Sequence, residues 1–335
     1  MRILSMILKI IFFQKFIFTK KLGFLLLALF VAFFFIGNVK RAEAVTSIID
    51  CTGLQNMSLN LAEDYTLANN IDCSATSGWN AGKGFIPIGN NNAGALVGYF
   101  TGSLHGNGFT IQNLHIVRPT ENFIGLIGQT NGADFQNLTI TGSIEGRSNT
   151  GTLVGAMNGS DTISNVSSSV TIVGHTQNIG GLVGDAGNIN ATGSSYSGSI
   201  TVNEPGFSVG NTGGLFGQCS GDINSSTATA TITVTGSSIF GIGGLVGISD
   251  GTDTGNNASG TITVTSAGSS VDTVGGLYGD FSGTANFVTS SVDITVTADS
   301  VSNIGGFIGN PESSTIIGGA ASGGITIHGG SVDHI

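Results

Sequence analysis

The chain has 335 residues, of which 55 are glycine, 40% are apolar and only 9% are charged. Glycine at this level without a strict three-residue period excludes collagen, and the apolar content argues against a disordered chain. Seven of the ten Lys and Arg residues lie in the first 41 positions, so the rest is strongly acidic and should repel nucleic acid and anionic lipid.

The first 44 residues have the pattern of a secretory signal peptide. An apolar run from Leu22 to Val39 follows Lys20 and Lys21, and an A-x-A word ends at Ala44. We expect cleavage after Ala44 and export of the chain. The alternative is an uncleaved anchor, because the run is about long enough to span a bilayer. The cleaved chain has 3 basic and 19 acidic side chains, a net charge of −16.

Residues 45–120 are expected to form short coils that cap the N-terminal end of a repeat region. The words IIDC and NIDC place Cys51 and Cys73 22 residues apart, which is close to one short coil. Equivalent positions in stacked coils lie about 4.8 Å apart, within the Cα separation of a disulfide. We predict this bridge, which fits an oxidising compartment. Cys219 is expected to be an inert thiol in a turn.

Residues 121–335 contain a short sequence motif, or word, of the form G-L-x-G that recurs about every thirty residues. Its central residues follow one another in steps of 27, 29, 33, 30, 32 and 30 positions. They are Leu126, Leu153, Leu182, Leu215, Leu245, Leu277 and Phe307. Self-similarity at this period indicates a repeat architecture.

A second word, of the form I-T-V, keeps the same period and alternates apolar with polar residues. Alternation of this kind predicts a strand with one buried face, which places the threonines outside. They are Thr139, Thr171, Thr201, Thr233, Thr263, Thr295 and Thr326. A weaker third word has Ile189 and Ile223 as its apolar points, so three short strands fill each period.

These words predict an all-β fold, a right-handed parallel β-helix that is a three-faced solenoid with about 30 residues per coil. A β-propeller is the structural alternative, but its blades run to about 40 residues with four strands each. Glycines such as Gly180, Gly181 and Gly184 are expected to supply tight corners with positive φ and to let neighbouring backbones approach closely.

The G-G-L-V-G word on a thirty-residue period resembles the GLUG motif of bacterial surface and secreted proteins. The words GFIPIGN, FTGSLHGNGFTIQNLHI and NFIGLIG resemble the segment that precedes the first repeat in that family, and LAEDYTLANNIDCSAT resembles an earlier one. The resemblance covers roughly residues 48–320 and implies an adhesin-like or surface-associated protein. His105 stands where the family usually has Asp.

The outward threonines have two interpretations. Thr suits an exposed strand and stacked hydroxyls can bond one another, so the column can be structural. Alternatively, a regular array of hydroxyls binds a periodic surface such as ice or a crystalline polysaccharide. The predicted binding residues are Thr171, Thr201, Thr231, Thr233, Thr235, Thr261, Thr263, Thr265 and Thr295, and the array is interrupted at Ser169, Asn203, Asp293 and His328.

We predict no catalytic residue, cofactor or metal site. The candidate carboxylates fall mostly in turns after the G-L-x-G word, where Asp bonds its own backbone; they are Asp161, Asp185, Asp222, Asp250, Asp253 and Asp280. The segment SDGTDTGNN lacks the spacing of a calcium loop. Residues 148–335 also contain no Lys or Arg, whereas polysaccharide-cleaving β-helix enzymes often use a basic residue.

The sequence therefore predicts an exported, non-enzymatic adhesin-like protein, extracellular or at the cell surface, that presents a repetitive β-helix surface. Its partner would be a host or environmental glycan or protein surface, and not nucleic acid; a membrane would be involved only through an uncleaved leader. The alternative function is binding of ice or a crystalline polysaccharide. An open last coil would expose strand edges, so we also expect end-to-end self-association or further sequence beyond it.

Overall fold

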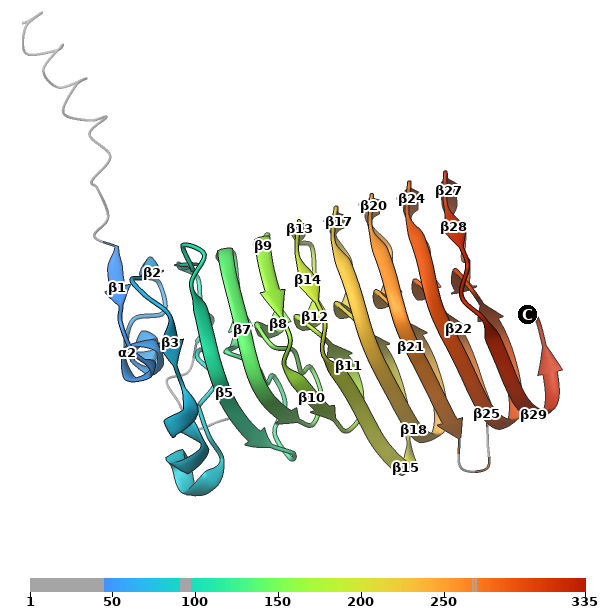
Figure 1. Ribbon diagram of the computed structural model, residues 1–335, viewed down its shortest axis with the longest axis horizontal. Coiled ribbons are helices and arrows are strands. Elements are labelled where there is room, and N and C mark those ends of the chain that lie inside the picture. Colours follow the sequence, from blue (N-terminus) through green and yellow to red (C-terminus); the bar gives the residue numbers. More distant parts are fainter. Residues whose placement is uncertain (1–44, 91–97, 267, 269) are drawn as a thin grey trace, which may run out of the picture. The chain divides into compact units, whose positions relative to one another are not determined.

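The computed structural model describes residues 45–90, 98–266, 268 and 270–335. Residues 45–335 form one compact unit, and the predicted signal peptide lies outside the described residues. The unit is a parallel β-solenoid of about 8 turns with roughly 30 residues per coil, in which strands greatly outnumber helices (Figure 1). The predicted parallel β-helix is confirmed, and the β-propeller is excluded. No helix among the described residues is long and apolar enough to cross a bilayer.

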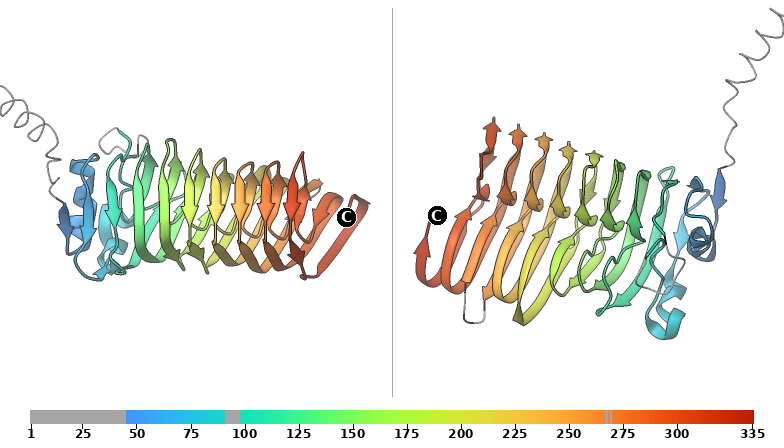
Figure 2. Two further views of the ribbon diagram at one scale, coloured as in Figure 1. Left: turned by 90° about the horizontal axis from the view of Figure 1, so that it is seen from above. Right: turned by 180° about the vertical axis from the view of Figure 1, so that it is seen from behind.

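Short elements cover the N-terminal end of the stack, where Figure 2 shows them beside the first long strands. In chain order they are β1 (Thr46–Ile48), α2 (Cys51–Asn56), η1 (Met57–Leu59), β2 (Tyr65–Leu67), β3 (Ile71–Asp72), η2 (Ser74–Gly82), β4 (Ser103–His105) and β5 (Thr110–Arg118). The Asp50 carboxylate caps α2 by accepting a hydrogen bond from the Gly53 amide at 2.7 Å. Leu54 and Met57 are fully buried, so this segment closes the end of the core.

Two parallel sheets form the coils. The smaller sheet consists of β6 (Ile127–Thr130), β8 (Val154–Met157), β12 (Val183–Ala186), β16 (Phe216–Cys219), β19 (Val246–Ser249), β23 (Tyr278–Phe281) and β26 (Ile308–Asn310). Besides β1 to β5, the larger sheet contains β7 (Asp134–Gly146), β9 (Thr162–Ser168), β10 (Thr171–Gly174), β11 (Gln177–Gly180), β13 (Asn190–Thr192), β14 (Ser195–Tyr196), β15 (Ser199–Gly213), β17 (Asp222–Asn224), β18 (Thr227–Gly243), β20 (Thr252–Thr254), β21 (Asn257–Ser266), β22 (Ser270–Gly275), β24 (Thr284–Asn286), β25 (Thr289–Gly305), β27 (Thr315–Ile317), β28 (Ala320–Ala321) and β29 (Ile325–Asp333).

The register of the smaller sheet reproduces the period of the sequence. Paired residues in successive strands are 27, 29, 33, 30, 32 and 30 positions apart, from Ile127 opposite Val154 to Tyr278 opposite Ile308. The six leucines of the G-L-x-G words are fully buried, and Phe307 packs on the core from the last coil. The predicted apolar stack along the axis is confirmed.

The third strand word is placed slightly differently from the prediction. Ile223 lies in β17 and is buried, but its partner in the preceding coil is Ala191 in β13. Ile189 precedes β13 and is also buried. Sequence spacing alone suggested that the two isoleucines are equivalent. They are not, because the corner that leads into this strand differs in length between the two coils.

The paired glycines act through close contact and not through their own φ angles. None of Gly180, Gly181 and Gly184 has a positive φ, so that part of the expectation is wrong. A Cβ on Gly181 would lie 2.1 Å from the Gly214 carbonyl oxygen, and one on Gly180 would lie 2.0 Å from the Val183 carbonyl oxygen. Both positions need glycine because backbone occupies the space of a side chain: the next coil's backbone at Gly181, and the backbone of its own coil at Gly180.

At one corner of each coil, asparagine more often than glycine supplies the left-handed residue. Before the last strand segment of each coil, register partners Asn178, Asn211, Gly241, Thr273 and Asn303 all have φ between 51° and 64°. Asn tolerates this conformation better than most residues. The Asn211 amide also donates to the Asn178 side-chain oxygen at 2.8 Å, which links neighbouring coils.

The predicted disulfide is present, although its geometry differs from the one expected. Cys51 and Cys73 are bonded, with their Cα atoms 5.2 Å apart. They are not equivalent positions of stacked strands, because Cys51 opens α2 and Cys73 directly follows β3. The bridge therefore joins the capping helix to the first full coil.

The glycine contacts predict a strong penalty for a single methyl group. In Gly243→Ala the new Cβ would lie 1.9 Å from the Val246 carbonyl oxygen, so we expect the free energy of unfolding to fall by about 3 kcal/mol. Thermal unfolding of the purified chain measures this. The matched control is Gly206→Ala, where nothing lies within 4 Å of the new Cβ. Equal melting temperatures for the two variants would contradict the close-contact account.

The disulfide predicts a countable chemical outcome. Alkylation of the denatured, unreduced chain should modify one thiol, Cys219, and alkylation after reduction should modify three. We expect reduction to destabilise the N-terminal coils by about 3 kcal/mol, because the bridge closes a loop of some twenty residues in the unfolded chain. Hydrogen exchange at α2 and β3 reports that loss. Three modified thiols without reduction would show that the bridge does not form.

Candidate functional site

The most regular outer surface belongs to the three coils that contain β18, β21 and β25. Ten consecutive residue pairs join β18 to β21, and nine join β21 to β25, without a bulge. Alternate residues point outward, and we call these fifteen positions the hydroxyl face. They are Thr227, Thr229, Thr231, Thr233 and Thr235 on β18, Asn257, Ser259, Thr261, Thr263 and Thr265 on β21, and Thr289, Ser291, Asp293, Thr295 and Thr297 on β25.

The hydroxyl face is a two-dimensional array. Outward residues repeat about every 6.7 Å along a strand, and the strands lie about 4.8 Å apart. Thr233, Thr263 and Thr295 are register partners in one such row, and the row continues to Thr326 on β29. Thirteen of the fifteen positions carry a hydroxyl, and all fifteen are exposed or half-buried. The inward residues between them, such as Ile232 and Val234, are fully buried.

Most of these hydroxyls are free to bind something outside the chain. Thr229 bonds Ser259 at 3.0 Å, and Thr289 donates to Asn257 at 2.9 Å. In the described part of the chain the other threonine hydroxyls of the face make no hydrogen bond; these are Thr227, Thr231, Thr233, Thr235, Thr261, Thr263, Thr265, Thr295 and Thr297. Each can both donate and accept.

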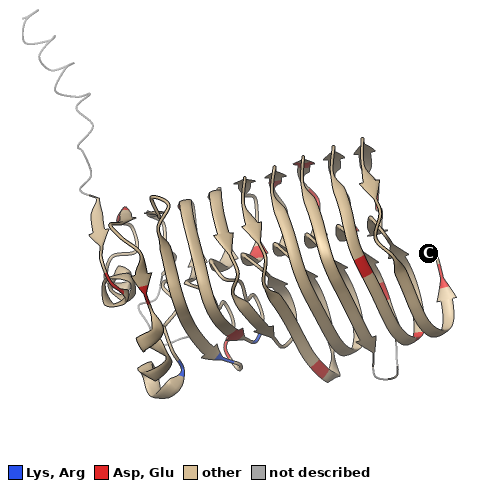
Figure 3. Ribbon diagram, in the orientation of Figure 1, with Lys and Arg blue, Asp and Glu red and all other residues tan. Residues whose placement is uncertain are grey.

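The face is also almost uncharged, in contrast to the acidic chain as a whole. Strands β18 and β21 contain no charged residue (Figure 3), and Asp293 is the one charged position of the face. Its carboxylate accepts a hydrogen bond from the Gly324 amide at 2.8 Å. A neutral ligand that covers two adjacent coils would therefore not have to remove water from charged side chains.

The structure brings together most of the threonines that the sequence singled out. Thr201 pairs with Thr233, and the six threonines of β18 and β21 and Thr295 lie in the array as expected. Thr171 does not belong to the row, because Val173 is the register partner of Thr201. Thr139 is also outside it, since its partner in the next coil is Ser167. The predicted single column of seven threonines is therefore wrong at its first two members.

The sequence-based prediction missed the rows of the hydroxyl face that lie nearest the start of each strand. Thr227, Thr229, Ser259, Thr289 and Ser291 extend the same alternation toward the start of each strand. Their signal is present in the words TATATITVT, NASGTITVT and TSSVDITVT, where every second residue is polar. Reading only the central I-T-V word left these positions unassigned.

Asp253 is the carboxyl group whose pKa is most strongly raised by its surroundings, and it lies in the core. It is the register partner of Ala285 and is fully buried. The Ile223 amide donates to its Oδ1 at 2.9 Å, and the Tyr278 hydroxyl donates to its Oδ2 at 2.6 Å. Burial raises the pKa of Asp253 to about 7. Its assignment to a turn is wrong, and an enclosed carboxyl of this kind is inaccessible to a substrate.

Cys219 is the last residue of β16 and not part of a turn, but it is buried. Burial, followed by the nearby Asp253 charge, raises the pKa of its thiol. The inert-thiol prediction is therefore supported, because the thiolate is the reactive form. Within the described ranges, no group of three or more His, Cys, Asp or Glu side chains could hold a metal ion.

Turn chemistry accounts for Asp161 but not for Asp222, which lies in β17. Asp161 accepts hydrogen bonds from the Ala133 amide at 2.6 Å and from the Gly159 amide at 3.2 Å. Asp222 accepts one from the Thr252 amide at 2.9 Å. Both carboxylates bond the backbone of a neighbouring coil, so they link successive coils.

No protein-family model matches the chain. It is 44% identical to Halomucin of Haloquadratum walsbyi (strain DSM 16790 / HBSQ001) over 154 residues, which are 44% of this chain and 2% of that protein. The chain therefore spans a very small part of this curated relative.

Two solved structures are similar to the chain to different degrees. An IgA1 protease superposes with a TM-score of 0.55 at 16% identity, over 87% of this chain and 22% of the other. A putative immunoglobulin A1 protease from Bacteroides ovatus has a TM-score of 0.45 at 14% identity, over 86% of this chain and 83% of its own. At this identity the first likeness shows the fold alone, and the second carries no argument.

The buried Asp253 predicts an unusual dependence of stability on pH. Its folded pKa of about 7 is above the value near 4 of an unfolded Asp. The unfolded chain therefore loses its proton first, so stability is full below about pH 4, falls as pH rises to about 7 and is constant above that. The three-unit shift corresponds to a loss of up to about 4 kcal/mol.

Asp253→Asn should remove this dependence, because the amide keeps the shape and the hydrogen bonds to Ile223 and Tyr278 without ionising. We expect its melting temperature to exceed that of the wild type at pH 8 and to match it closely at pH 4. Asp299→Asn, at an exposed position, is the control and should not change the difference between the two pH values. Parallel pH curves for wild type and Asp253→Asn would refute the assignment.

Proposed function

We propose that this chain is an exported, non-enzymatic binding protein whose hydroxyl face docks against an extended neutral polysaccharide. The observation that carries the proposal is the array itself: three coils in register present thirteen hydroxyls, most of them without a hydrogen-bond partner. An ordered glycan offers repeating hydroxyls that can exchange hydrogen bonds with such an array. Each bond is individually weak in water, at about 1 kcal/mol net, so binding requires many of them at once.

Three further observations support an extracellular, adhesin-like role. The first 44 residues have the pattern of a signal peptide, and Cys51 and Cys73 form a disulfide of the kind found in oxidising compartments. The 154-residue likeness to Halomucin, which its name identifies as a mucin, fits the same location. The likeness to IgA1 proteases concerns the fold, so it adds no catalytic role to this chain.

Ice is the second candidate ligand, for one specific reason. Over β18 and β21 the face has no charged residue, and its free hydroxyls repeat in two directions. An ice surface is also a periodic array of hydrogen-bonding oxygen atoms. Ice would bind in competition with liquid water, whereas a polysaccharide would bind at room temperature, so the two ligands are separable by experiment.

The decisive variant is Thr233→Tyr combined with Thr263→Tyr. Two phenol rings on adjacent coils would stand above the neighbouring threonines and hold a flat ligand away from them. We expect the fraction of protein retained on insoluble cellulose or chitin to fall at least tenfold. If ice is the ligand instead, thermal hysteresis will be lost in the same variant and no retention on polysaccharide will be seen.

The matched control is Thr252→Tyr with Thr284→Tyr, a register pair on β20 and β24 outside the hydroxyl face. It adds the same two rings to neighbouring coils, so retention should equal that of the wild type. Wild-type retention by the Thr233/Thr263 variant would contradict the proposal, as would a wild type that binds neither polysaccharide nor ice.

A further inference from the structure

A second surface feature lies at the corner where the long strands bend, on the coils that precede the hydroxyl face. The register fixes how many residues each coil uses to turn this corner. Residues 119–123 fill it in the first of four coils, 147–149 in the second, 175–178 in the third and 203–211 in the fourth. Two short corners are therefore flanked by two longer ones, which leaves a recess about two coils wide.

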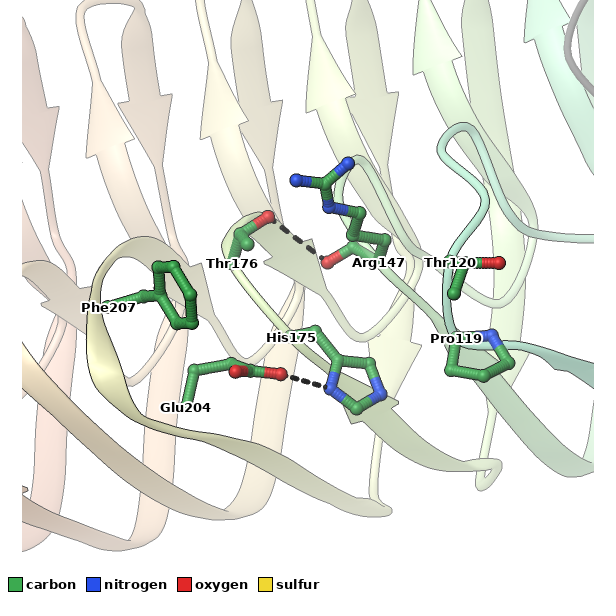
Figure 4. A pocket seen from close by; sticks show the side chains of 7 residues that line it. All are labelled: Pro119, Thr120, Arg147, His175, Thr176, Glu204 and Phe207. Carbon is green, nitrogen blue, oxygen red and sulfur yellow. Dashed lines mark hydrogen bonds and ion pairs between the residues drawn. The ribbon is translucent and has the colours of Figure 1, made fainter.

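Seven residues line this recess, and its volume is about 190 Å³. They are Pro119, Thr120, Arg147, His175, Thr176, Glu204 and Phe207 (Figure 4). The flanking corners contribute Pro119 and Thr120 on one side and Glu204 and Phe207 on the other. A water molecule occupies about 30 Å³ in the liquid, so the recess has room for about six waters or for one sugar ring.

The carboxylates beside the recess already have a partner. His175 lies between two of them, with its Nδ1 2.7 Å from Glu204 and its Nε2 3.0 Å from Glu145. Each ring nitrogen of His175 is therefore within hydrogen-bond distance of a carboxylate oxygen. This pairing fixes the positions of both Glu side chains and leaves the second oxygen of Glu204 able to accept from a ligand.

Arg147 supplies a cationic side chain to the recess. In the described part of the chain the other two basic side chains, Lys83 and Arg118, both form ion pairs with Glu121. The exposed Arg147 guanidinium has no ion pair there; its backbone oxygen accepts a hydrogen bond from the Thr176 side chain at 3.3 Å. A guanidinium presents a planar pair of donors that matches a carboxylate.

Phe207 supplies an apolar surface opposite these polar groups. It is 66% exposed, on the segment of β15 where the register to β18 shifts between Glu204 and Ser208. An exposed aromatic ring on a protruding corner gains nothing for the core, but it can pack against the C–H face of a pyranose. Figure 4 shows Phe207 and the Arg147 side chain around the recess, with Thr176 between them.

We propose that this recess binds one sugar residue that carries a carboxylate, of the uronate or sialate type. Arg147 holds the carboxylate, Phe207 packs against the ring, and Glu204, Thr120 and Thr176 bond the hydroxyls. The site is separate from the hydroxyl face, so it adds an acidic saccharide to the neutral ligand proposed above. Its test does not depend on whether that first proposal is correct.

Titration of the full-length chain with glucuronic acid, N-acetylneuraminic acid and glucose tests the proposal, with ligand-observed NMR as the readout. We expect at least one acid to bind at least tenfold more tightly than glucose, and the two acids distinguish a uronate site from a sialate site. Arg147→Gln should weaken binding of that acid at least tenfold, because it loses a charge-assisted contact. Phe207→Ala should weaken it about fivefold through lost packing.

Both substitutions are at exposed positions, so the melting temperature should not change and a lost signal can be assigned to the site. Lys83→Gln is the matched control, since it removes an exposed cation outside the recess, and the affinity for the acid should be that of the wild type. The proposal is overturned if neither acid binds, if glucose binds as tightly as both acids, or if Arg147→Gln leaves the affinity unchanged.

Discussion

Backbone contact between successive coils at the paired glycines is the constraint on which the rest of this structure depends. The first glycines of the pairs, Gly180, Gly213, Gly243, Gly275 and Gly305, are register partners through five coils. The second glycines make the contact with the next coil: a Cβ on Gly181, Gly214, Gly244 or Gly276 would lie 2.1–2.2 Å from the carbonyl oxygen of Gly214, Gly244, Gly276 or Gly306, respectively. Because these positions accept no side chain, they allow one alignment of each coil on the next. The apolar stack inside and the rows of hydroxyls outside both follow from that alignment.

A solenoid built in this way keeps its faces constant and varies its corners. Between β18, β21 and β25 the register continues over nine or more residues, so chemically similar side chains gather into one surface. At the corner after residue 202 the chain instead uses nine residues where its neighbour uses four. The constant register yields an extended array suited to a repetitive ligand. The variable corner length yields a recess suited to a single small ligand.

The sequence was sufficient for the period, the buried leucines and the three strand segments per coil, because each depends on spacing that repeats along the chain. It also predicted the Cys51–Cys73 bridge, although the two cysteines are not equivalent positions of stacked strands. It was insufficient where corner length matters. Thr139 and Thr171 were placed in the wrong row because the motif around each is shifted relative to the next coil, by four residues for Thr139 and by two for Thr171. Asp253 was predicted to be a turn residue, but its alignment with Ile223 and Ala285 places its side chain inside the solenoid. The sequence does not indicate this because the hydrogen-bond partners that allow a carboxyl group in the core, such as the Tyr278 hydroxyl, are distant in sequence.

The central claim is that coils in fixed register bring Thr233 and Thr263 side by side, and engineered disulfides test it most directly. In Thr233→Cys with Thr263→Cys the two Cα atoms would be about 4.8 Å apart, within the range of a disulfide. In Thr233→Cys with Thr265→Cys they would be about 8 Å apart and outside it. The account predicts rapid oxidation of the first pair in the folded chain and none of the second. Cross-linking of the second pair in preference to the first would contradict it.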